Sequence, residues 1–338
     1  MKQRYQWLDI AKGIAIILVV IGHVVSSYHS SKLYLDNNLF IIVHNFAYSF
    51  HMALFMIVSG FLFALSSKKR ISIRSKEIKK KIINYGIPYV IFSFVWWIFK
   101  IVLASHANTQ VSIYDLLLIP IYPISFMWFI YALLIMQLIQ LFLEPKTLRY
   151  KVTHLLIAFA FLLLQPTLSQ LLEIIHFEDL IICDVMKFYL YFLLGIYFPD
   201  IFESILKITW LKWGIFFLIF ILMFSCNEYF SIENKIVKLL LALVGSYIVL
   251  SFSYSLKQNK ILEFLGKNSL PIYVLHGLAI AATRSIITHL YDGSDYYGVF
   301  PLFLCSVMGV LIPVIIYLIL RKIWKFDFIF SPGKYIKF

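Results

Sequence analysis

The chain has 338 residues, of which 62% are hydrophobic and only 14% are charged. Runs of about 20 apolar residues recur along its whole length, and no polar stretch is long enough to fold alone. This composition excludes an ordinary soluble protein and predicts a single membrane-embedded domain over residues 1–338. The net charge of +13 does not indicate a nucleic-acid partner, because the basic residues stand in short loops between apolar runs.

The apolar runs predict an all-α, polytopic membrane protein with about ten transmembrane helices. They lie at 10–28, 43–66, 83–104, 125–144, 152–168, 182–198, 209–226, 236–255, 269–290 and 299–320. The fifth and sixth are the least regular. The fifth meets Gln165-Pro166, and the sixth contains Asp184 and Lys187.

Lysine and arginine predict the orientation of these helices, because both residues concentrate on the cytoplasmic side of membranes. If the N-terminus is cytoplasmic, nearly all lysines and arginines outside the spans lie in the loops and tails on the cytoplasmic side. The loop at Asp292-Gly293-Ser294-Asp295, on the other side, is acidic. Both termini are therefore predicted to be cytoplasmic. The basic residues on the cytoplasmic side include Lys2, Arg4, Lys68, Lys69, Arg70, Arg74, Lys76, Lys79, Lys80, Lys81, Lys146, Lys207, Lys257, Lys325 and Lys337.

Asp9, Lys12 and His23 are ionisable residues that stand in or beside the first span. Eleven positions separate Lys12 from His23, so their side chains fall on nearly the same helix face, roughly 16 Å apart along the axis. Asp9 can pair with Lys12 three residues later. Ionisable groups inside a span are costly and indicate a functional site. The alternatives are an interfacial anchor for Lys12 and a carbonyl-bonded histidine for His23.

Further polar residues occur in later spans. His44 and His51 are seven residues apart and share one face of the second span, with His51 at the deeper position. Ser59 can donate a hydrogen bond there, or simply pack with Gly60 as a small pair. His276, in the ninth span, faces the same cavity or bonds a neighbouring helix. The three cysteines show no metal-ligand spacing, so no metal site is expected.

The segment Leu8–Ile16, followed by Val19–His23, resembles the opening motif of the acyltransferase 3 family. In that motif an Arg or Lys is followed by ten residues and then by a His, and Lys12 and His23 fit this spacing. Phe50–Met56 with Ser59–Leu62 resembles its second block, although Ala53 stands where the family usually has proline. The resemblance covers most of the chain in order. Its weaker later blocks are Lys79–Lys81 before Ile87–Tyr89, Trp128-Phe129, Gly195 and Ser269–His276.

The resemblance implies an integral-membrane O-acetyltransferase in the inner membrane of a bacterium. Its donor would be cytoplasmic acetyl-CoA, and no tightly bound cofactor is expected. Its acceptor would be a hydroxyl of a cell-surface polysaccharide, of capsule, exopolysaccharide or O-antigen type, or of a lipid-linked precursor. Two rival hypotheses remain, a polysaccharide exporter or flippase without transferase activity, and a lipid- or antibiotic-modifying acyltransferase. Transporters more often show inverted repeats or broken helices, which this sequence does not display.

Acetyl transfer to a hydroxyl requires removal of a proton, stabilisation of an oxyanion and a hold on the donor. His23 is the candidate general base, because imidazole titrates near neutral pH, and an acyl-histidine nucleophile is the alternative. The expected site residues fall into three groups. They are His23, His51 and Asp9 for catalysis, Lys12, Lys80 and Lys81 for the donor, and Ser59, His276 and Trp128 for the substrate.

Overall fold

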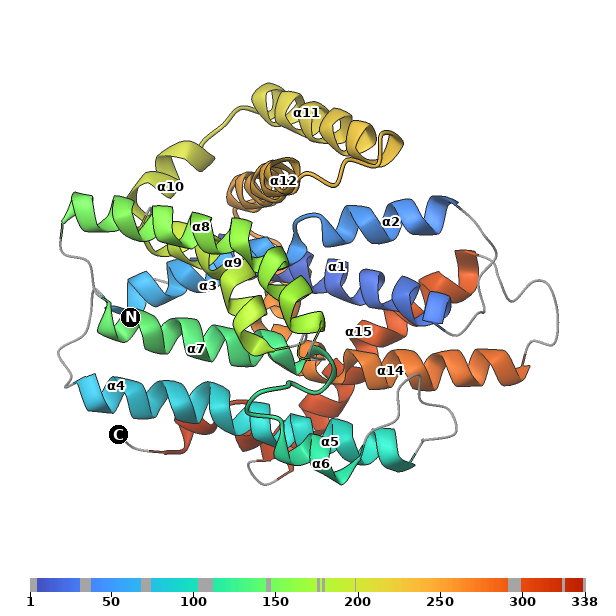
Figure 1. The fold of residues 1–338 in the computed structure, drawn as a ribbon. Helices are drawn as coiled ribbons and strands as arrows, with labels where there is room; N and C mark the ends of the chain where they lie inside the picture. Colours follow the sequence, from blue (N-terminus) through green and yellow to red (C-terminus); the bar gives the residue numbers. More distant parts are fainter. Residues whose placement is uncertain are drawn as a thin grey trace. The chain divides into compact units, whose positions relative to one another are not determined.

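The computed structural model describes residues 5–30, 38–67, 74–102, 112–143, 147–174, 177, 180–197, 199–290, 299–323 and 326–336. Helices dominate these ranges, and no strand occurs within them (Figure 1). The all-α prediction is therefore confirmed. Several residues used to predict the topology lie outside the described residues, namely Lys2, Arg4, Lys68, Lys69, Arg70, the acidic loop 292–295, Lys146, Lys325 and Lys337.

Nine helical stretches in the described ranges are long and apolar enough to cross a membrane, and each overlaps a predicted span. They are Gln6–His29, Phe40–Ser66, Arg74–Val102, Ser125–Phe142, Leu148–Glu173, Trp210–Tyr229, Lys235–Ser255, Ser269–Leu290 and Val299–Lys322. The remaining predicted span, 182–198, is the 17-residue helix α9 (Ile181–Tyr197). At 1.5 Å per residue α9 is about 26 Å long, near the lower limit for crossing the hydrocarbon core.

The second predicted span is two helices rather than one. Helix α2 (Asn38–Tyr48) ends at a turn over Ser49 and Phe50, and α3 (His51–Ser67) follows directly. The hydroxyl of Ser49 donates to the carbonyl oxygen of Phe46 at 2.8 Å. Side-chain bonds of this kind compete with the helical pattern, and here one accompanies the interruption.

Two proline-containing spans behave differently from expectation. The third begins earlier than predicted, since α4 (Arg74–Lys81), a π-helical turn (Ile82–Gly86) and α5 (Ile87–Val102) run on continuously. Pro88 has no N–H to donate to the preceding turn, which fits the irregular geometry there. The fifth, α8 (Leu148–Glu173), continues through Pro166 beyond its predicted end.

The chain folds as two compact units, each made of separate stretches of sequence. Unit 1 comprises Met1–Val58 and Asp200–Ile319, and unit 2 comprises Ser59–Pro199 and Leu320–Phe338. In unit 1, α1 (Gln6–Ser30) packs against α2, α12, α13 and α14 (Figure 1). The other helices of unit 1 are α10 (Pro199–Leu206), α11 (Trp210–Tyr229), α12 (Lys235–Ser255), α13 (Lys260–Lys267), α14 (Ser269–Leu290) and most of α15 (Val299–Lys322).

Two glycines allow α1 and α13 to cross at close range. A Cβ atom at Gly266 would collide with the carbonyl oxygen of Asp9, and one at Gly13 with the carbonyl oxygen of Leu262. Small residues let helix backbones approach in this way in membrane proteins. The close crossing places the Asp9 end of α1 directly against α13.

Unit 2 is built around α7 (Trp128–Phe142), α8 and α9. The part of α3 in this unit approaches α9, where a Cβ atom at Gly60 would collide with the carbonyl oxygen of Phe192. Near the C-terminus, the short 3-10 turn Pro332–Lys334 packs against the π-helical turn, and the turn Phe326–Ile329 packs against α5. At the first of these contacts the backbone N–H of Gly333 donates to Oδ1 of Asn84 at 3.1 Å.

Candidate active site

The ion pair expected on α1 is present. Nζ of Lys12 lies 2.8 Å from Oδ1 of Asp9, and the two side chains are only 21% and 8% exposed. The separation of three residues brings them together on the helix surface. The pair is thus a mostly buried charged feature next to α13, about three helical turns from His23.

The three predicted histidines of unit 1 gather at one place. The ring centroids of His23 and His276 are 4.9 Å apart, which joins α1 to α14. Tyr48, the last residue of α2, lies between His23 and the first residue of α3, His51. Its hydroxyl is 3.4 Å from Nδ1 of His23, and its ring centroid is 4.9 Å from that of His51. We call His23, Tyr48, His51 and His276 the histidine cluster.

The hydrogen-bond partners of two cluster histidines define their chemistry. Nδ1 of His51 lies 2.6 Å from the carbonyl oxygen of Ala47, and Nδ1 of His276 lies 2.6 Å from that of Tyr273. A carbonyl oxygen can only accept, so each Nδ1 carries a hydrogen. In the neutral ring the lone pair is therefore on Nε2. Both side chains are almost fully buried, at 1% and 0% exposure.

A chain of polar contacts continues from the cluster to α11. The ring of His44 stacks on Tyr48 with centroids 4.1 Å apart. Nδ1 of His44 lies 3.1 Å from Oδ1 of Asn45, whose amide donates to Glu228 at 2.7 Å. Tyr48, Asn45 and Glu228 did not emerge from sequence reasoning. The spacing of His44, Tyr48 and His51 at i, i+4 and i+7 was the available signal.

The other predicted site residues belong to unit 2. Lys80 is exposed on α4, and Nζ of Lys81 lies 4.9 Å from the ring centroid of Phe63. Ser59 is half-buried on α3, next to the close contact at Gly60. One face of Trp128 stacks on Phe188 with centroids 5.3 Å apart, and this face is therefore already covered.

Arg284 has a structural role in unit 1. Its guanidinium donates to both the carbonyl oxygen and the hydroxyl of Ser27, each at 2.7 Å. Ser27 lies in the last turn of α1, where backbone carbonyls lack helical partners and cations are favourable. Arg284 thus ties α14 to the end of the helix that carries His23.

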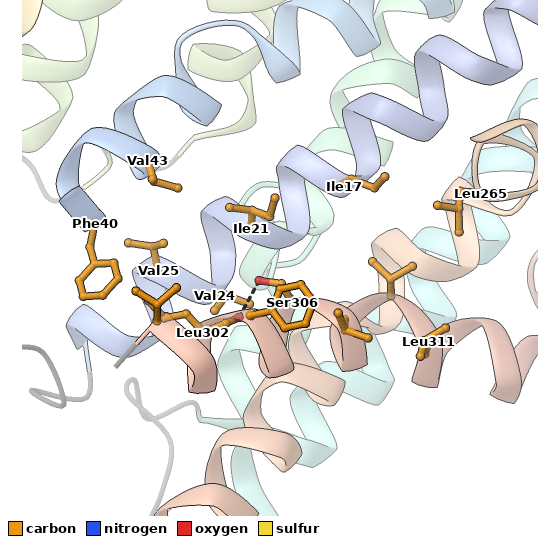
Figure 2. A pocket seen from close by; sticks show the side chains of 14 residues that line it. Ile17, Ile21, Val24, Val25, Phe40, Val43, Leu265, Leu302, Ser306 and Leu311 are labelled. Carbon is orange, nitrogen blue, oxygen red and sulfur yellow. Dashed lines mark hydrogen bonds between the residues drawn. The ribbon is translucent and has the colours of Figure 1, made fainter. Parts of the chain in front are cut away.

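Unit 1 also contains an apolar cavity of about 490 Å³ between α1, α2, α13 and α15 (Figure 2). Ser306 is the one polar side chain among the described residues that line it, and its hydroxyl donates to the carbonyl oxygen of Leu302 at 2.8 Å. Successive side chains of a helix are rotated by about 100°, so the α1 residues that line the cavity lie on nearly the opposite helix face from His23. The cavity therefore contains no group suited to acyl transfer. The lining side chains of α1 are Ile17, Ile21, Val24 and Val25.

No three His, Cys, Asp or Glu side chains in the described ranges are arranged to hold a metal ion.

The amino-acid sequence matches one known protein family over nearly its whole length. A family model described as "Acyltransferase domain" matches residues 5–320. This range contains every residue named above as a site candidate. No curated protein and no solved structure matches the chain.

Proposed function

We propose that this chain, which belongs to the acyltransferase 3 family, is an O-acetyltransferase. Family membership makes the chain an acyltransferase, and its apolar helices make it a multi-pass membrane protein. The proposed donor is cytoplasmic acetyl-CoA. The proposed acceptor is a hydroxyl of a cell-surface polysaccharide or of its lipid-linked precursor, and the proposed location is a bacterial inner membrane.

The histidine cluster is the observation that supports this proposal. It brings His23, His51 and His276 from three helices to one place, and the neutral rings of His51 and His276 have their lone pair on Nε2. Polyhydroxyl acceptors offer O–H donors, which match nitrogen lone pairs. A site of this kind suits the removal of a proton from an acceptor hydroxyl.

In the proposed reaction His23 acts as the general base. The hydroxyl proton of the acceptor moves to His23 while its oxygen attacks the carbonyl carbon of the thioester. The new C–O ester bond forms, the C–S bond breaks, and the departing thiolate takes the proton from the His23 imidazolium. His276 and His51 accept hydrogen bonds from neighbouring acceptor hydroxyls in this scheme. Ser59 and Trp128 are proposed to contact the substrate.

The donor is proposed to be held by cations. Lys12, oriented by Asp9, would meet the donor from the cytoplasmic end of α1, roughly 16 Å along the axis from His23. Acetyl-CoA has its phosphates and its thioester at opposite ends of a long arm, so such a separation is suitable. Lys80 and Lys81 of the basic helix α4 are proposed as further phosphate contacts.

The decisive experiment measures acetyl transfer in membranes from cells that express the chain. Labelled acetyl-CoA is supplied, and alkali-labile label in the surface glycan is counted. We expect the His23→Ala variant to lose at least about 100-fold in rate, the usual contribution of a general base. The matched control is His289→Ala, because His289 is exposed on α14 about 13 residues beyond His276 and roughly 20 Å along that helix.

Two results would contradict the proposal. Equal amounts of label with the native chain and with His23→Ala would show that His23 is not needed for catalysis. No label from any form, combined with failed glycan export in cells lacking the protein, would favour an exporter instead. Each variant is first checked for the native unfolding temperature, so that loss of label is not loss of fold.

A further inference from the structure

We propose that Glu228, Asn45 and His44 form a second binding site for the acceptor, which takes the hydroxyl groups of one sugar unit next to the histidine cluster. The site lies within unit 1, where α2 contributes His44 and Asn45 and α11 contributes Glu228. Its role in acceptor binding rests on the proposed function. The hydrogen bonds among its three side chains do not depend on that function.

Glu228 is a half-buried acidic residue in the last turn of the mostly apolar helix α11. Its Oε2 accepts from the amide of Asn45 at 2.7 Å, and its Oε1 accepts from the amide of Asn227 at 3.4 Å. A carboxylate has two lone pairs on each oxygen, so these bonds leave one lone pair on each. No lysine or arginine within the described ranges forms an ion pair with Glu228.

The orientation of the Asn45 amide follows from Glu228. A carboxylate only accepts hydrogen bonds, so the amide nitrogen faces Glu228 and the amide oxygen faces His44. Nδ1 of His44 lies 3.1 Å from that oxygen and therefore carries a hydrogen. The neutral His44 ring then has its lone pair on Nε2.

Apolar packing already joins α2 to α11. The ring of Phe46 meets the rings of Phe220 and Phe224 edge-on, with centroids 5.6 and 5.7 Å apart. Removing a charge from water is costly, and an apolar side chain at position 228 would extend this packing without that cost. An ionisable residue in a membrane span indicates a functional site, and here the carboxylate retains lone pairs that a ligand can use.

The site adjoins the histidine cluster and is open at its edge. The His44 ring covers one face of Tyr48, with centroids 4.1 Å apart, and the Tyr48 side chain remains 40% exposed. His44 and Tyr48 are one helical turn apart, about 6 Å along α2. A sugar ring is of similar size, so a glycan with one unit on Glu228 and His44 can present the next unit to His23.

The chemical class of the ligand follows from the remaining lone pairs. The carboxylate of Glu228 and Nε2 of His44 accept hydrogen bonds and donate none. Their complement is a molecule with several O–H groups, and two adjacent hydroxyls match the two oxygens of one carboxylate. Hydrogen bonds to a carboxylate are charge-assisted and roughly twice as strong as neutral ones. Glu228 should therefore contribute more to affinity than His44.

The test uses the full-length protein in detergent and the surface glycan of the expressing cells, treated with alkali to remove its ester-bound acetyl groups. Glu228→Gln retains an oxygen that accepts from Asn45 but removes the charge. We expect KM for this glycan to rise about tenfold, while KM for acetyl-CoA keeps its native value. His44→Phe keeps a ring against Tyr48 and removes Nε2, so we expect a rise of about threefold. The matched control is Glu233→Gln, at an exposed position shortly after α11.

Binding of the alkali-treated glycan is also measured by calorimetry without acetyl-CoA, which separates this site from the proposed reaction. Binding about tenfold weaker in Glu228→Gln than in Glu233→Gln supports the site, even if the native chain transfers no acetyl group and the proposed function fails. Native affinity in Glu228→Gln, or no binding by the native chain, refutes the site even in an active acetyltransferase. Equal rises in KM for both substrates would show that Glu228 only maintains the fold, and would also overturn the proposal.

Discussion

Gly22 leaves the space in which the Tyr48 ring lies beside α1. An added methyl group would press on the ring of Tyr48, whose side chain is 40% exposed and can move outward. We expect Gly22→Ala to lower kcat, because the displaced Tyr48 side chain loses its contacts with the rings of His23 and His51. The measurement is the acetyl-transfer rate at saturating substrate.

The control for this variant is Gly214→Ala on α11. A Cβ atom at Gly214 meets no heavy atom within 4 Å, so the same chemical change has no steric effect there. Native activity in both variants would show that Tyr48 does not need to lie against α1.

Lys12 offers a second prediction at the residue scale. We expect Lys12→Gln to raise KM for acetyl-CoA by about tenfold, the effect of losing one charge-assisted hydrogen bond of roughly 1.4 kcal/mol. The change also removes the Lys12 ammonium from the mostly buried carboxylate of Asp9, which is itself costly.

The double variant Asp9→Asn with Lys12→Gln separates these effects. It removes both charges and leaves no carboxylate to be compensated. If KM for acetyl-CoA remains high, Lys12 binds the donor. A return to the native KM would mean that Lys12 serves only to neutralise Asp9.

At the scale of helices, the crossing of α1 and α13 is a point of little tolerance. A methyl group at Gly266 would meet the backbone carbonyl of Asp9, which cannot rotate away as a side chain can. We expect Gly266→Ala to lower the free energy of unfolding by about 1–3 kcal/mol, as overpacking does. Thermal unfolding in detergent measures this, with Gly214→Ala again as control. Equal unfolding temperatures of the two variants would show that α1 and α13 can move apart at little cost in free energy.

Helices α7, α8 and α9 of unit 2 share a closed ring of hydrogen bonds that sequence patterns did not reveal. Nε2 of His154 lies 2.9 Å from the hydroxyl of Tyr189, which donates to Oε1 of Gln140 at 3.1 Å. The amide of Gln140 donates to the hydroxyl of Tyr197 at 3.3 Å, and that hydroxyl lies 2.5 Å from Nδ1 of His154. All four bonds can point in one direction if His154 is neutral with its hydrogen on Nε2.

This ring predicts a stability effect without a catalytic one. Tyr189→Phe leaves Oε1 of Gln140 without the tyrosine donor inside the helix packing, and the expected loss is about 1–3 kcal/mol of unfolding free energy. Tyr150→Phe, at an exposed position on α8, should change stability by less than about 0.5 kcal/mol. Comparable unfolding temperatures for the two variants would argue against a structural role for the ring.

For the whole molecule, the predicted topology can be tested with cysteine labelling. Cys226 is exposed near the end of α11, on the side predicted to be outside. A membrane-impermeant thiol reagent should therefore label it in intact cells. Ser204, exposed on α10 and predicted to be inside, provides the contrast as Ser204→Cys with Cys226→Ser. That cysteine should react only after permeabilisation, and the reverse pattern would invert the topology.

The sequence by itself was sufficient for the membrane class, the helical fold and the family. Each of these depends on local properties, namely apolar runs of spanning length and short motifs such as Lys12 to His23. The same local information located nine of the ten spans as apolar helices of spanning length. It did not foresee the break after Tyr48, because an apolar run looks the same whether one helix or two pass through it.

The tertiary structure alone decided which polar groups meet. His23 and His276 are more than 250 positions apart, and only the packing of α14 on α1 brings their rings together. The sequence does not distinguish Tyr48 from the other tyrosines of the chain, which has 22 in total, because the contact of its hydroxyl with His23 appears only in the fold. The direction of a hydrogen bond follows from the partners present in space. For that reason the motif identifies His23 as a candidate, and only the packing shows that Tyr48 and His276 lie beside its ring.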